Sequence, residues 1–470
     1  MKSEVNKIIS VFFPRIHKNA FRFNLLTSFG FSFLSFWYVL SYGSLALKTI
    51  ATDGRAFYFA AATQSLVQGR FDVPDGYLAG MGGECLNYGE KCLGYFGLTP
   101  SLIRVPLYML GFSIASLGSA LFILIAYGIY LTIVYRIFSS TKSSHEKNQG
   151  IVGLITGLTL GFSPVFFLAG RTYLYEEAII WSVVFSLLVI LMLLRYQELM
   201  KPKYLVLSVT FSFLALHSRV TTGIGCILAI SIFLFFHHIK KTVSNNLFYL
   251  TLSSTLGVFA SYFILNKFKF GSFLPDIVKY HGGILANPTR AEFYTQNSQF
   301  DLQRLPLLFL NYFFPVLNAY PGELVYSPGQ YSFQFFGLSL SANSLEQSEY
   351  FSPLPNTYPL LFLFGVIGIY LLIRKKDFQN FWIVGFIFPV AINCILISAT
   401  QRYLSDFVPL FVVLSFLAIR KLDFHGLFLR IAIVLMCCFQ VVSAYQITIS
   451  FWNYSKDRPA EFVNLFGAKE

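Results

Sequence analysis

Long apolar runs follow one another along the chain, separated by short polar stretches. A helix needs roughly 20 apolar residues to cross the hydrocarbon core of a bilayer. About eleven runs come near this length or exceed it, and the fifth and sixth are short. They lie at 25–50, 117–138, 150–168, 177–195, 204–217, 221–237, 247–266, 358–374, 380–399, 404–420 and 426–449. The pattern predicts an all-α polytopic membrane protein with about eleven transmembrane helices.

The composition agrees with this pattern. Hydrophobic residues make up 55% of the 470 residues and charged residues only 12%, whereas soluble domains carry about twice that charged fraction. No internal repeat or low-complexity tract divides the chain. We therefore expect a single membrane domain over residues 1–470.

The positive charge is distributed unevenly between alternate segments. With a cytoplasmic N-terminus, the inner segments hold 19 Lys and Arg against 5 acids, and the outer segments hold 16 against 17. The inner segments thus account for the whole net charge of +13, as the positive-inside rule requires. This places the N-terminus in the cytoplasm. No basic patch is left that would indicate a nucleic-acid partner.

Two connections are long, and both fall on the outer side, at 51–116 and 267–357. In the first, apolar residues recur at helical spacing over Arg55–Gln68, which predicts an amphipathic helix lying on the membrane surface. The run 102–116 contains Arg104 and a proline, and is either a second juxtamembrane helix or an early start of the next span. The second connection, rich in aromatic residues, Asn, Gln and Pro, is expected to be a long irregular loop before the eighth span.

Two of the six cysteines, Cys85 and Cys92, share the first outer loop, and the other four lie within apolar runs. In an oxidising compartment a disulfide between Cys85 and Cys92 would close that loop. The alternative is two separate thiols. The loop offers no His and no third Cys, so a zinc site there is not expected.

Asp53 stands where the first apolar run leaves the bilayer, directly before the predicted helix Arg55–Gln68. A carboxylate is costly inside hydrocarbon, so this one must face water, a partner or a substrate. Two interpretations are open. Asp is a favoured N-cap residue, so Asp53 can cap the following helix. It can also act as a catalytic base at the membrane surface.

Several segments in these loops resemble the GT-C glycosyltransferases, membrane enzymes similar to protein O-mannosyltransferases and to the aminoarabinose transferases of lipid A. The similar segments are Thr52–Ala56 leading into a predicted surface helix, Cys92–Pro100 followed by Leu102–Leu107, Phe270–Phe273 with Tyr280–His281, and Arg402–Pro409. Their order and side of the membrane extend the resemblance over most of the chain. One segment departs from the family pattern, because the proline expected directly after Phe-Gly-Ser is displaced to Pro275.

The resemblance implies a function. GT-C enzymes take a sugar from a polyprenyl-phosphate donor, without a nucleotide, and pass it to an acceptor on the outer face. Here the acceptor would be a glycan, lipid or protein of the cell envelope, and the location the bacterial inner membrane, with membrane lipid around the enzyme. Asp53 matches the family's catalytic acid, so it is expected to deprotonate the acceptor hydroxyl in an inverting reaction.

Glu176 and Glu177 lie in the outer turn between the third and fourth runs. The family has an acidic residue near this turn, which implies a role in binding acceptor or metal. The alternative is that both acids stabilise the helix N-terminus through its dipole. No cofactor is required by the sequence; a paired-acid site can hold a divalent metal, but no ligand cluster demands one.

Arg219 stands where the fifth run reaches the outer surface, next to His217. An arginine at that depth needs an anionic partner, which is either the phosphate of the lipid donor or, structurally, Glu176 or Glu177. Arg402 and Tyr403 lie at another outer turn and are expected to reach the same phosphate. Asp406 instead offers Arg402 a local i,i+4 ion pair.

Two other functions stay open. One is a lipid-linked oligosaccharide transporter or ligase of the envelope; a ligase would place its charged residues, such as Arg290 and Arg304, in the late outer loop. Transport is disfavoured, because the charges cluster at the outer edges of the runs instead of deep within them. The other is a scaffold without activity.

Overall fold

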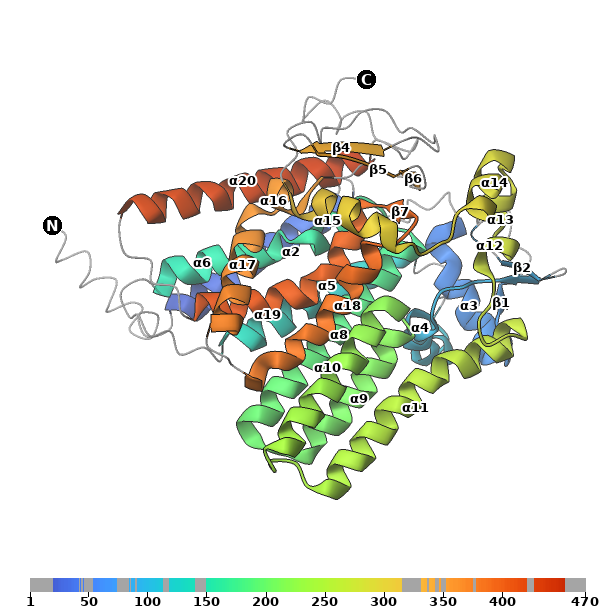
Figure 1. Ribbon diagram of the computed structural model, residues 1–470, viewed down its shortest axis with the longest axis horizontal. Helices are drawn as coiled ribbons and strands as arrows, with labels where there is room; N and C mark the ends of the chain where they lie inside the picture. Colours follow the sequence, from blue (N-terminus) through green and yellow to red (C-terminus); the bar gives the residue numbers. More distant parts are fainter. Residues whose placement is uncertain are drawn as a thin grey trace.

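The computed structural model describes residues 20–41, 43, 45, 54–73, 84, 86–88, 91–112, 118–139, 149–314, 331–335, 338–342, 346–347, 352–374, 378–420 and 427–452. Most of this part is helical (Figure 1). Among the described residues, seven helical segments are long and apolar enough to cross a bilayer: α2 (Ala20–Leu40), α5 (Ser119–Ser139), α8 (Leu174–Leu199), α10 (Val220–Ile239), α11 (Asn245–Phe270), η9 (Gln401–Phe407) continued by α19 (Val408–Ile419), and α20 (Leu427–Trp452). The chain is a helical, multi-pass membrane protein, as predicted.

The remaining predicted runs correspond to shorter or broken helices. α6 (Gln149–Gly161) is followed, after a bend of 43°, by α7 (Pro164–Phe167) and η6 (Leu168–Gly170), and the pair can form an eighth span. Three apolar segments are shorter: α9 (Pro202–Leu216), α17 (Pro359–Arg374), and η8 (Phe378–Phe386) with α18 (Ile387–Asn393). Each predicted run therefore overlaps a helical segment, while the total of eleven spans stays a prediction. The first run was predicted to reach residue 50, but α2 ends at Leu40.

Small residues allow α2 and α6 to pack closely. A Cβ atom on Gly153 would lie 2.3 Å from the Phe21 carbonyl oxygen, and one on Gly157 would lie 2.4 Å from Ser28 Cβ. Glycines spaced four residues apart on one helix face let two backbones approach each other within a membrane. This contact fixes the first helix against the middle of the bundle.

A buried glutamine on α20 joins the bent span to the start of α17. Gln440 donates hydrogen bonds to the carbonyl oxygens of Thr159 (2.8 Å) and Phe162 (3.2 Å), next to the bend. Its own amide oxygen accepts from the backbone N–H groups of Leu360 (3.1 Å) and Leu361 (3.2 Å). Backbone groups that a bend or a helix start leaves unpaired are costly in hydrocarbon. Gln440 satisfies both sets at once.

We expect Gln440→Leu to lower the thermal unfolding temperature of the detergent-solubilised protein. Each lost bond leaves a buried backbone group unsatisfied, at about 1–3 kcal/mol per group. Gln446, exposed on the same helix, provides the control, and Gln446→Leu should leave the unfolding temperature unchanged. Equal unfolding temperatures for the two variants would contradict this account of Gln440.

The first outer loop is more deeply packed than predicted. It contains η2 (Gly54–Phe57), α3 (Tyr58–Val67), a three-stranded antiparallel sheet in the order β1-β3-β2, and α4 (Thr99–Met109). The strands are β1 (Asp72–Val73), β2 (Leu86–Tyr88) and β3 (Lys91–Leu93). Most side chains of α3 are buried, so this helix packs against the protein, while its place at the membrane surface stays a prediction. α4 ends at Met109 and α5 begins at Ser119. α4 is therefore a second helix of this loop and not an early start of the next span.

The second outer loop is more regular than predicted. The described part contains α12 (Ile277–Tyr280), α13 (Gly282–Leu285), α14 (Pro288–Gln296), η7 (Leu302–Arg304) and α15 (Leu305–Phe313). It also contains the hairpin β4 (Tyr331–Phe335) and β5 (Leu338–Ala342), then β6 (Glu346–Gln347), which pairs with β7 (Ser398–Ala399), and α16 (Leu354–Thr357). The prediction of an irregular loop is therefore wrong for this part. In Figure 1, α3, α4, β1, β2 and α12–α14 gather at one end of the molecule.

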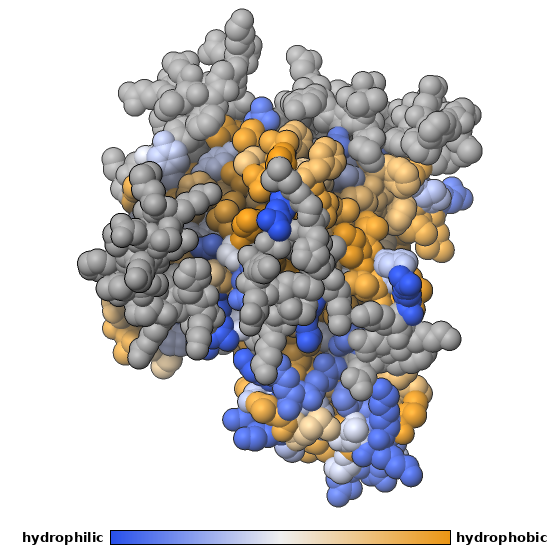
Figure 2. Space-filling model, turned by 90° about the vertical axis from the view of Figure 1, so that its left-hand side faces the viewer, coloured by the Kyte–Doolittle hydropathy of each residue, from blue (hydrophilic) through white to orange (hydrophobic). Residues whose placement is uncertain are grey.

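The opposite ends of α8 to α11 are polar and exposed. The turns between α8 and α9 and between α10 and α11 carry exposed lysines at Lys201, Lys203, Lys240 and Lys241. Figure 2 shows hydrophilic residues gathered at the lower end of the molecule, where Figure 1 places the end of α10 and the start of α11. Apolar residues cover much of the surface above them (Figure 2).

Candidate functional site

Arg402 and Glu176, which the sequence places 226 positions apart, meet at the end of the bundle that carries the outer loops. Arg402 Nη1 lies 3.8 Å from Glu176 Oε1, and the guanidinium lies over the Tyr175 ring, 4.1 Å from its centre. Tyr175 and Glu176 belong to the first turn of α8, while Arg402 belongs to η9, which packs against α8. The structure thus joins two of the predicted site residues.

Arg219 forms a second ion pair with the same short helix, η9. Its Nε lies 2.8 Å from Asp406 Oδ1 and 2.9 Å from Oδ2. Asn393 Nδ2 donates to the same carboxylate at 3.0 Å. The Arg219 guanidinium also lies over the ring of Tyr403, 5.1 Å from its centre. The anionic partner of Arg219 is therefore Asp406, and neither Glu176 nor Glu177 takes that place.

This pairing also changes the account of Asp406. The sequence suggested a local i,i+4 pair between Asp406 and Arg402, but η9 is a 3-10 helix, in which residues four apart do not share a face. Asp406 turns instead to Arg219 at the start of α10. The short segment η9 thus takes part in two ion pairs, through Arg402 with Glu176 and through Asp406 with Arg219.

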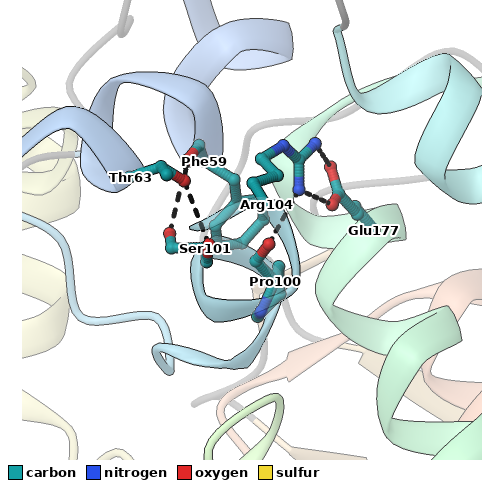
Figure 3. Close-up of polar contacts among 6 residues, drawn as sticks. All are labelled: Phe59, Thr63, Pro100, Ser101, Arg104 and Glu177. Carbon is teal, nitrogen blue, oxygen red and sulfur yellow. Dashed lines mark hydrogen bonds and ion pairs between the residues drawn. The ribbon is translucent and has the colours of Figure 1, made fainter. Parts of the chain in front are cut away.

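Glu177 has a different partner from Glu176. Arg104 on α4 forms a two-pronged ion pair with it: Arg104 Nη2 lies 2.8 Å from Glu177 Oε2, and Nη1 bonds Oε1 (Figure 3). Nη1 also donates to the carbonyl oxygen of Pro100 at 2.9 Å. The guanidinium lies 3.6 Å from the centre of the Phe122 ring. Both charged side chains are 0% exposed, so this ion pair holds α4 against α8.

The start of the first outer loop lies near this pair. Thr63 Oγ1 donates to the Phe59 carbonyl at 2.6 Å and to the Ser101 carbonyl at 3.1 Å, which ties α3 to α4 (Figure 3). η2, which begins at Gly54, packs against α5 and α8. Asp53 itself lies outside the described residues, as does Cys85. The short helix η2, which begins one residue after Asp53, thus contacts the helix that carries Glu176.

A cluster that the sequence did not predict lies under Arg402. Glu84 Oε2 accepts hydrogen bonds from the Tyr175 hydroxyl and, at 3.3 Å, from the Tyr95 hydroxyl. The two hydroxyl oxygens are 2.6 Å apart. His281 Nε2 lies 3.7 Å from the same carboxylate oxygen. Burial, together with Tyr175 and Glu84, raises the pKa of Tyr95 well above its ordinary value, so Tyr95 keeps its proton and acts as a donor.

His217, close to Arg219 in the sequence, is buried and pairs with a serine of α11. Its Nε2 lies 2.9 Å from the Ser261 hydroxyl. The Lys269 ammonium is buried and donates to the carbonyl oxygens of Gly94 (2.5 Å) and Phe96 (3.2 Å). It therefore ties the first outer loop to α11.

The remaining site predictions concern cysteines and metal. Cys92 is disulfide-bonded, while Cys226, Cys394, Cys437 and Cys438 are free. Within the described part of the chain, no three His, Cys, Asp or Glu side chains are grouped so that they could hold a metal ion.

No protein-family model matches the chain, and no curated protein resembles it significantly.

Sequence reasoning missed the Arg104–Glu177 pair and the Glu84 cluster. The signal for the first was an arginine within an apolar helix, because such a residue requires a buried acid. Nothing in the sequence around Glu84 marks it in the same way, since two of its partners, Tyr175 and His281, come from distant segments.

Proposed function

We propose that the protein is a membrane glycosyltransferase of GT-C type, which moves a sugar from a polyprenyl-phosphate donor to an acceptor of the cell envelope. Its site would face the exterior of the bacterial inner membrane. The observation that carries the proposal is the contact between Arg402 and Glu176, which come from two segments that the sequence assigns to one site. The helix that carries Glu176, α8, also contacts η2, which begins directly after Asp53. An enzyme whose donor is a lipid phosphate needs a cation at this membrane edge.

The proposed reaction uses these residues as follows. The acceptor hydroxyl oxygen attacks the anomeric carbon and gives its proton to Asp53. The bond between that carbon and the phosphate oxygen breaks, and its electron pair stays on the polyprenyl phosphate. Arg402 stabilises the charge that develops there. Tyr403, the next residue, is assigned to the same phosphate. Glu176 balances the charge of Arg402 before the donor binds.

Arg219 takes a supporting role in this proposal. Its charge is already matched by Asp406, and its side chain keeps 18% exposure. Because Nε is the atom that bonds Asp406, we assign the Nη groups of Arg219 to the phosphate. Arg402 is thus the first ligand of the donor phosphate and Arg219 the second.

The ligase alternative is weaker on these contacts. Arg304 is buried, and its guanidinium donates to the carbonyl oxygens of Ser298 (2.8 Å), Gln299 (3.4 Å) and Ile395 (3.4 Å). It therefore anchors the second outer loop to the segment after α18. Such an arginine is engaged with backbone and is poorly placed to bind a lipid-linked sugar.

We expect Arg402→Gln to raise the KM for the lipid donor by about ten- to a hundredfold, since a charge-assisted bond to phosphate contributes about 1.5–3 kcal/mol. The assay is transfer from a polyprenyl-phosphate sugar by protein reconstituted in liposomes. Arg195→Gln is the matched control: Arg195 pairs with Glu198 at the other end of α8. An unchanged donor KM in Arg402→Gln would remove Arg402 from the site.

A further inference from the structure

Glu84 lies at the meeting point of three parts of the chain that are far apart in sequence. It belongs to the first outer loop, its partner Tyr175 begins α8, and its neighbour His281 belongs to the second outer loop. A backbone bridge pairs Leu86 with His281 as well. The side chain of Glu84 is 14% exposed, so the carboxylate is largely withdrawn from water.

The bond from Tyr175 to Glu84 fixes the ring that supports Arg402. Tyr175 donates its proton to the carboxylate, and the neighbouring Tyr95 hydroxyl, 2.6 Å away, closes a triangle with both. A tyrosine held at its hydroxyl and packed at its ring cannot rotate away. Tyr95 also stacks on Phe96, whose ring meets the Tyr175 ring edge to face. The orientation of the Tyr175 ring is thus determined by these contacts.

The same bond strengthens the contact above the ring. A phenol that donates to a carboxylate gains electron density in its π system, and the face of an electron-rich ring attracts a guanidinium more strongly. Arg402 lies 4.1 Å from the centre of this ring and 3.8 Å from Glu176 Oε1. Two acids therefore act on Arg402: Glu176 from the side, and Glu84 through the Tyr175 ring.

We propose that Glu84 is a positioning residue that, through Tyr175, holds the Arg402 guanidinium where it meets the phosphate of the lipid donor. This inference rests on the proposed function. It assigns no chemical step to Glu84, since the residue acts on Arg402 and not on the reacting atoms. Loss of Glu84 or of the Tyr175 hydroxyl should consequently weaken donor binding only while Arg402 is present.

The test measures binding of undecaprenyl phosphate to the protein in nanodiscs by native mass spectrometry. Glu84→Gln and Tyr175→Phe are each expected to raise the Kd about fivefold, the size of a partial loss of a cation–π contact. Glu292, an exposed glutamate of the second outer loop, supplies the matched control, and Glu292→Gln should bind as the wild type does. In an Arg402→Gln background, Glu84→Gln should cause no further loss.

The outcomes separate this inference from the proposed function. If wild-type protein does not bind undecaprenyl phosphate, the proposed function fails, and the role of Glu84 falls with it. If the wild type binds and Glu84→Gln binds equally well, the inference alone is wrong. It is also wrong if Glu84→Gln weakens binding to the same degree with and without Arg402, because that result would show a general loss of structure.

Discussion

Glu177→Leu is expected to lower the free energy of unfolding by about 3–5 kcal/mol, because it leaves the Arg104 guanidinium buried without a counter-charge. Both side chains are 0% exposed, and the arginine is enclosed by the rings of Phe59 and Phe122. It cannot turn toward water without separating α4 from α8. The measurement is the thermal unfolding temperature in detergent, together with the yield of folded protein.

A double variant provides the control for this prediction. Replacing a whole buried ion pair by apolar residues of similar volume is often neutral or stabilising. Arg104→Met combined with Glu177→Leu should therefore recover most of the unfolding temperature that Glu177→Leu loses. If the double variant is as unstable as the single one, the ion pair is not the reason for the loss.

The helices could be predicted from the sequence because a bilayer demands long apolar runs. Each predicted run overlaps a helical segment, and the bend after Gly161 has a proline, Pro164, at its far side. The predicted irregular second loop was wrong for a reason visible in the sequence. Asn287 before Pro288 is a favourable helix start, and Asn287 indeed accepts a hydrogen bond from the Arg290 backbone N–H.

The ion pairs of the site could not be predicted in the same way. The acids at 176 and 177 are adjacent, yet they point to arginines on two different helices. Which acid meets which arginine depends on how α4 and η9 lie against α8, and no local pattern in the chain records that arrangement. The residue types could be predicted, whereas the pairing required the tertiary structure.

Asp53→Asn is expected to reduce the rate of sugar transfer by about a hundredfold to ten-thousandfold, the usual contribution of a positioned general base. Asparagine keeps the shape of the side chain and can still cap a helix, so folding should be preserved. Donor binding should also be preserved, because in this account Arg402 and Arg219 hold the phosphate. The measurement is kcat for transfer, with the Kd for undecaprenyl phosphate determined in parallel.

Asp72→Asn is the matched control. Asp72 lies in the same outer loop, on β1, and pairs with Arg70 at 3.5 Å. It takes no part in the proposed site, so its replacement should leave kcat within about twofold of the wild type, as is usual for changes away from a functional site. A similar loss in both variants would indicate that the loop, and not the Asp53 carboxylate, is what matters.

The measurement that tests the central claim most directly is the release of polyprenyl phosphate in a single turnover. Purified protein in liposomes is mixed with a panel of polyprenyl-phosphate hexoses and pentoses and with envelope extract as the acceptor. We predict that the wild type releases polyprenyl phosphate from at least one donor, that Asp53→Asn binds this donor without releasing it, and that Arg402→Gln binds it weakly. No release from any donor, or undiminished release by Asp53→Asn, would contradict the proposed glycosyltransferase mechanism.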